Sequence, residues 1–68
     1  MDVTSEVGFC AGEIYGLLAG EGGEIPMSQI LKRLRREDDL IIAAVGWLLR
    51  EDKIEIIKKE RGITVKLK

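Results

Sequence analysis

The side chains that could do chemistry in this sequence are almost all carboxylates and bases, because its 68 residues include no histidine and a single cysteine, Cys10. Zinc sites built from cysteine and histidine are therefore excluded, and so are disulfides within the chain. We interpret Cys10 as a small buried hydrophobe, since a redox role would need a second thiol. The sequence predicts no metal site and no cofactor.

The remaining titratable side chains give little support for catalysis. Without histidine, general acid–base chemistry would depend on carboxylates, lysines or Tyr15, and the carboxylates fall at predicted helix starts or outward strand positions, where they are normally solvated. The glycine-rich residues 20–23 resemble a phosphate-binding loop in composition, but they follow a helical pattern and lack the Gly-Lys-Ser/Thr ending. We therefore expect neither an enzyme nor a small-molecule substrate.

The bases are confined to the second half of the sequence. Residues 1–31 carry five acids and no base, whereas residues 32–68 carry eleven bases and seven acids. Such clusters can contact phosphates, which supply most of the nonspecific affinity for DNA. The alternative is that they are ordinary solvated faces, since the net charge is only −1. The predicted nucleic-acid-binding residues are Lys32, Arg33, Arg35 and Arg36 on a second helix, and Lys58, Lys59 and Arg61 on or near a hairpin.

Apolar periodicity indicates the elements that must position these groups. Helical spacing predicts a first helix with Thr4 or Ser5 as its cap and an end at the glycines of residues 20–23. Ile25 and Met27 alternate with polar or proline neighbours, which predicts a short edge strand. The apolar stripe of the first helix is expected to comprise Val7, Cys10, Ala11, Ile14, Leu17 and Leu18.

Two further helices and a hairpin follow. Ser28 is expected to cap the second helix, and after a turn at residues 36–38 a third helix runs from about residue 39 to 51 with Asp38 as its cap. Every residue from 40 to 49 is apolar or glycine, so this helix must be covered on more than one side. Residues 54–56 and 63–67 then show strand alternation around a charged turn at residues 58–62, which predicts a C-terminal β-hairpin.

The apolar third helix predicts self-association. A chain this short buries only about 60% of its unfolded surface and is marginally stable alone. Without a metal or disulfide, a second subunit is the remaining source of stability. The candidate dimer contacts are Ile42, Ala43, Trp47 and Leu49 on the third helix, and Gly12 and Gly16 on the first. Core packing and base stacking are the alternatives for Trp47, and coincidence is the equal alternative for the glycine spacing.

No segment approaches the 18 apolar residues that a membrane helix needs, and the first residues lack the basic region of a secretory signal. The sequence therefore predicts a cytoplasmic protein that does not enter a membrane.

The predicted order of elements is that of a winged helix-turn-helix domain, an α+β fold with three helices, a short edge strand and a C-terminal hairpin wing. Residues 7–15, 44–54 and 65–68 resemble a family of small prokaryotic winged-helix proteins known only as a domain of unknown function. The resemblance implies one domain over residues 1–68, a homodimer, and DNA binding as an expectation from the fold.

Two functions follow from these observations. In the first, the homodimer binds double-stranded DNA weakly through the second helix and the wing. Sequence readout by the third helix is disfavoured, because Glu37, Asp38 and Asp39 in or near its first turn would repel phosphates and no base-reading side chain follows them. In the alternative, the fold serves as a protein-interaction module without DNA binding.

Overall fold

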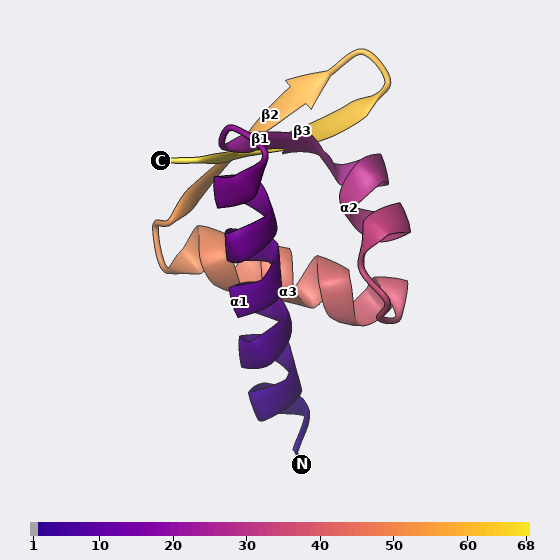
Figure 1. The fold of residues 1–68 in the computed structure, drawn as a ribbon, viewed down its shortest axis with the longest axis vertical. Coiled ribbons are helices and arrows are strands. Elements are labelled where there is room, and N and C mark those ends of the chain that lie inside the picture. Colours follow the sequence, from indigo (N-terminus) through magenta and orange to yellow (C-terminus); the bar gives the residue numbers. More distant parts are fainter. Residues whose placement is uncertain (1) are drawn as a thin grey trace.

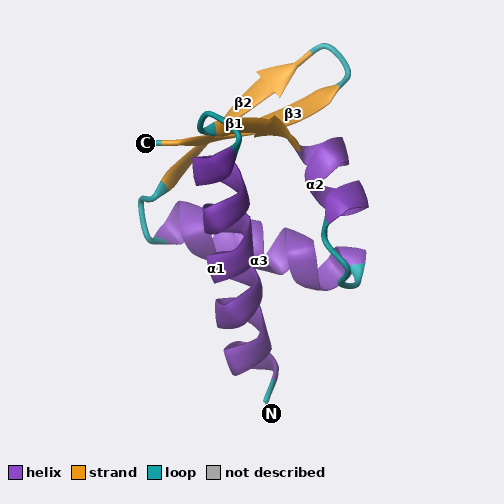
Figure 2. Ribbon diagram, in the orientation of Figure 1, coloured by secondary structure: helices purple, strands orange, loops and turns teal. Residues whose placement is uncertain are grey.

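The computed structural model describes residues 2–68 as three helices and a three-stranded antiparallel sheet. The α+β fold class and the predicted order of elements are confirmed. Figure 2 shows the strands gathered at one end of the helices. In chain order the elements are α1 (Val3–Gly20), β1 (Glu24–Pro26), α2 (Met27–Arg33), α3 (Asp38–Arg50), β2 (Ile54–Lys59) and β3 (Gly62–Leu67).

The core lies where α1, α3 and the sheet meet. Helix α1 crosses α3 and reaches the sheet with its C-terminal end, and both contacts bury the same apolar stripe (Figure 1). Of the predicted stripe only Leu17 is partly exposed, and Cys10 is fully buried as a free thiol. The fully or almost fully buried partners on the other elements are Ile25, Ile30, Ile41, Ala44, Val45, Leu48, Ile54 and Val65.

Helix α1 begins earlier than the sequence predicts. Asp2 occupies the N-cap position, and its carboxylate accepts a hydrogen bond from the Ser5 backbone N–H at 2.8 Å. The carboxylate also faces the positive end of the helix dipole. The prediction of Thr4 or Ser5 as the cap is wrong, because the cap at Asp2 places both residues inside the first turn of the helix.

The junction between β1 and α2 also differs from the prediction. The strand ends at Pro26, and Met27 is the first residue of α2, so Met27 does not belong to the strand and Ser28 is not the cap. Pro26 has φ of −60° and ψ of 141°. A proline disfavours helical geometry in the residue before it, which favours the extended conformation of Ile25. Pro26 is itself extended, and the helix begins directly after it.

The link from α2 to α3 places two predicted bases outside a helix. Helix α2 ends at Arg33, because Leu34 turns to an extended conformation with ψ of 139° and packs against the core. Arg35 and Arg36 therefore lie in the linker, and their assignment to the second helix is wrong.

Helix α3 begins and ends one residue earlier than predicted. Glu37 stands at its N-cap position without a side-chain hydrogen bond, and Asp38 is the first helical residue. Asp38 is therefore not the cap. It lies with Asp39 in the first turn, where negative charge is favoured by the helix dipole.

The hairpin strands are longer than the alternation suggests. Lys58 and Lys59 belong to β2, so the predicted turn at residues 58–62 shrinks to the two residues between paired Lys59 and Gly62. Gly62 has φ of +119°, which glycine adopts without steric cost. Strand β1 pairs with the other edge of β3, and the sheet order is β1-β3-β2.

Replacement of Ile14 by alanine should lower the free energy of unfolding by about 2–5 kcal/mol, because it opens a cavity at a fully buried position of α1. The change Val3→Ala is the control, since Val3 is 70% exposed, and it should alter stability by less than about 0.5 kcal/mol. Urea unfolding followed by circular dichroism, at one protein concentration, measures both. Equal stability of the Ile14 variant and the unmodified protein would contradict this core.

Candidate nucleic-acid interface

The free end of the hairpin carries three bases that form no ion pair within residues 2–68, beside a single acid, Glu60. Lys58, Lys59 and Arg61 are exposed and take part in none of the ion pairs of residues 2–68. Adjacent residues of a strand point to opposite faces, so Lys58 and Lys59 present charge on both sides of the hairpin. This end of the wing can therefore approach a phosphate backbone from either face.

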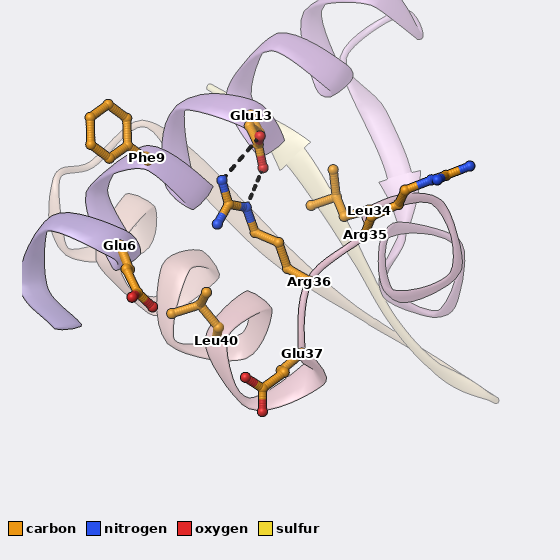
Figure 3. A pocket seen from close by; sticks show the side chains of 8 residues that line it. All are labelled: Glu6, Phe9, Glu13, Leu34, Arg35, Arg36, Glu37 and Leu40. Atoms are coloured by element: carbon orange, nitrogen blue, oxygen red, sulfur yellow. Dashed lines mark hydrogen bonds and ion pairs between the residues drawn. The ribbon is translucent and has the colours of Figure 1, made fainter. Parts of the chain in front are cut away.

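The bases of α2 and the following linker divide into paired and unpaired groups. The Arg33 guanidinium donates to the Glu21 carboxylate at 3.0 Å, and Arg36 donates to both carboxylate oxygens of Glu13, at 2.5 and 3.2 Å. Lys32 and Arg35 are exposed and make no ion pair within the described residues. Figure 3 shows Arg35 directed away from the Arg36–Glu13 pair.

Acidic neighbours neutralise the bases at the other end of β3. Lys66 lies directly between Glu24 of β1 and Glu55 of β2 in the sheet register. Cross-strand pairs of opposite charge attract each other. Lys68 donates to the Asp52 carboxylate at 2.5 Å. These two lysines are thus less available to phosphates than the bases at the hairpin turn.

Helix α3 presents one side chain suited to reading bases, Arg50 in its last turn. Its solvent side carries Ile42, which is 54% exposed, and Leu49, which is 46% exposed. Ala43 and Gly46 are exposed between them. Contacts with base edges in the major groove need side chains such as Arg, Asn or Gln, and here only Arg50 at the helix end has this character.

The predicted dimer residues fall on two separate surfaces. Ile42, Ala43 and Leu49 lie on the solvent side of α3, while Gly12 and Gly16 are exposed on α1 with no atom within 4 Å of the position a Cβ would take. Trp47 is 38% exposed. Its indole ring would lie 3.8 Å from a Cβ on Gly8, so it packs against α1 without entering the core.

A groove between α1 and the α2–α3 linker was not predicted from the sequence. It is an open depression of about 900 Å³. Figure 3 shows Phe9 and Leu40 on its walls and the Arg36–Glu13 pair across one end. The paired residues are 23 positions apart, and no sequence pattern indicated that they meet.

Ion pairing and burial fix the protonation states around these surfaces. The hydrogen bond from Arg36 lowers the pKa of the Glu13 carboxyl, and the bond from Arg33 lowers the pKa of Glu21. Burial raises the pKa of the Cys10 thiol. Cys10 therefore stays protonated and is a poor nucleophile.

Two further features of residues 2–68 bear on function. Their Cys, Asp and Glu side chains form no group that could hold a metal ion. Within the same residues, no helix has the length and apolar character needed to traverse a bilayer.

Comparison with known proteins identifies relatives of the whole chain. The model of a family described as a winged helix-turn-helix domain (DUF2582) matches residues 1–67. The chain is also similar to the uncharacterized protein MJ1608 of Methanocaldococcus jannaschii. The two are 46% identical over 70 residues, which cover 98% of this chain and 97% of the relative. No solved structure matches.

The change Arg36→Gln should raise the pKa of Glu13 toward its ordinary value, because the hydrogen bond from Arg36 is the main cause of the lowered value. The paired state is fully charged above the ordinary carboxyl pKa and is lost as the pH falls through the lowered pKa of the folded protein. Titration of the Glu13 carboxyl carbon by NMR measures the shift. Arg35→Gln is the matched control and should leave this pKa unchanged; equal shifts in both variants would refute the assigned pair.

Proposed function

We propose, from the premise that this chain belongs to the DUF2582 family of winged helix-turn-helix domains, that it is a homodimeric DNA-binding module of the kind found in transcription regulators. It binds duplex DNA through the wing and the α2 side of the molecule, with little sequence preference. Its activity is binding without catalysis, and its expected location is the cytoplasm.

The observation that carries this proposal is the position of the unpaired bases. Figure 1 shows the turn of the β2–β3 hairpin on the same side of the molecule as α2, and α2 packs against β3. The exposed bases without an ion pair in this region are Lys32, Arg35, Lys58, Lys59 and Arg61. Phosphate contacts by such side chains provide affinity that does not depend on base sequence.

Arg33 and Arg36 have a smaller part in this proposal than the sequence predicts. Each already donates hydrogen bonds to a carboxylate of α1 or its C-terminal cap. To contact DNA they would have to exchange that partner for a phosphate. The unpaired bases meet no such competition, so we expect them to supply most of the electrostatic affinity.

The acidic start of α3 argues for the same binding mode. Glu37, Asp38 and Asp39 are all exposed there and make no ion pair within residues 2–68. A helix that entered the major groove by this end would bring three carboxylates close to the phosphates. Binding through the wing keeps these carboxylates away from the DNA backbone.

The double change Lys59→Gln with Arg61→Gln should weaken duplex binding and make its salt dependence shallower by about one unit of slope per lost phosphate contact. The measurement is a fluorescence anisotropy titration against a mixed-sequence duplex at several salt concentrations. Two duplexes of unrelated sequence should give similar affinities.

The matched control is Lys66→Gln with Lys68→Gln, which removes the same charge from bases that already have acidic neighbours. This pair should leave the slope nearly unchanged. An equal loss in both double variants would mean that only total charge matters and would overturn the proposed surface. Absence of binding at low salt would overturn DNA binding altogether and favour the protein-interaction module.

A further inference from the structure

We propose that the solvent face of α3 binds the same face of a second copy of this chain, with the two helices antiparallel. This geometry rests on the homodimer proposed above and names its contact surface. The α3 face is defined here by Asp39, Ile42, Ala43, Gly46, Trp47 and Arg50. All six residues are exposed.

The centre of the α3 face is suited to close approach by another helix. Residues 39, 43, 46 and 50 follow one another at spacings of four and three, so they form a single line along the helix. The two middle positions are Ala43 and Gly46. No atom lies within 4 Å of the position that a Cβ on Gly46 would take. Nothing in residues 2–68 therefore requires glycine at position 46, whereas a second helix crossing α3 at this point would require a small residue there.

One antiparallel register makes this face complementary to itself. If Ala43 lies opposite the partner's Gly46, then Asp39 lies opposite the partner's Arg50. Ile42 lies beside the partner's Ile42 along one flank of the contact, and Trp47 lies beside the partner's Trp47 along the other. The contacts between unlike residues each occur twice because the arrangement has two-fold symmetry. Small residues thus meet at the crossing, larger apolar residues meet beside it, and opposite charges meet at both ends.

The charge distribution supports the antiparallel direction. A shallow hollow of about 230 Å³ beside Ala43 is lined by three carboxylates, those of Glu6, Glu37 and Asp39. In this register the partner's Arg50 reaches that acidic hollow. Arg50 makes no ion pair within the described residues of its own chain. Antiparallel helices also bring opposite dipole ends together.

The α3 face and the proposed DNA surface use different residues. A second copy on α3 covers the helix that would otherwise enter the major groove, while the hairpin turn and Lys32 stay outside this contact. DNA binding through the wing is therefore compatible with this dimer.

A charge exchange tests the register. Asp39→Lys alone and Arg50→Glu alone each place like charges opposite one another at both ends, so each should raise the dimer dissociation constant by roughly tenfold or more. The combination of both changes restores opposite charges and should bring the constant back to within about threefold of the unmodified value. Sedimentation equilibrium between ~1 and ~100 µM measures it.

The control for this exchange is Arg61→Glu, which makes the same change of charge at the hairpin turn and should leave the dimer unaffected. Circular dichroism establishes that each variant is folded. A double variant as weak as the single ones, or an Arg61 variant as weak as the Arg50 variant, would overturn the register.

A second pair of variants separates the two candidate surfaces. Gly46→Gln adds a side chain where the monomer has open space, so the fold should persist while dimerisation is lost. Gly16→Gln does the same on α1 and should leave the dimer intact. The reverse result would overturn the α3 interface and retain the homodimer. A monomer at ~100 µM would overturn the homodimer as well, and the wing titration would still test DNA binding by itself.

Discussion

The packing of one apolar stripe of α1 against both α3 and the sheet is the interaction on which the rest of this structure depends. Cys10 and Ile14 lie at its centre with no exposed surface, and Leu18 ends it in the same state. A chain of this length has no further layer with which to cover its helices. The glycine side of α1 and the solvent side of α3 are therefore left open, and these are the surfaces available to partners.

The charged side chains are also unevenly paired over the surface. Acids of α1 and the turn after it neutralise Arg33 and Arg36, and these solvent-accessible pairs link the α2 region to α1. The acids near Lys66 and Lys68 do the same at the end of the sheet. Among the unpaired groups of residues 2–68, bases outnumber the single acid Glu60 at the hairpin turn and lie near α2, while the start of α3 is acidic and its end carries Arg50. A net charge of −1 conceals this separation.

Periodicity predicted the elements well, because burial of a stripe imposes a repeat that is visible in the residues. The stripe of α1 and the order of helices and strands were both obtained in this way. Caps were predicted poorly, since Asp2 caps α1 ahead of Thr4 and Ser5 and Pro26 stands at the N-cap position of α2 in place of Ser28. The Arg36–Glu13 pair could not be predicted, because it depends on how a seven-residue helix and its linker fold back onto α1.

Helix α3 departs most clearly from what an isolated domain needs. A glycine in the middle of a helix costs about 1 kcal/mol relative to alanine. At Gly46, as at Gly12 and Gly16 of α1, no contact within the described residues compensates for this cost. Ile42 and Leu49 expose large apolar surfaces on the same helix. Local rules broken without compensation are typical of functional surfaces. A second copy packed against α3 would explain both the glycine at position 46 and the exposed side chain of Ile42, whereas contact with solvent explains neither.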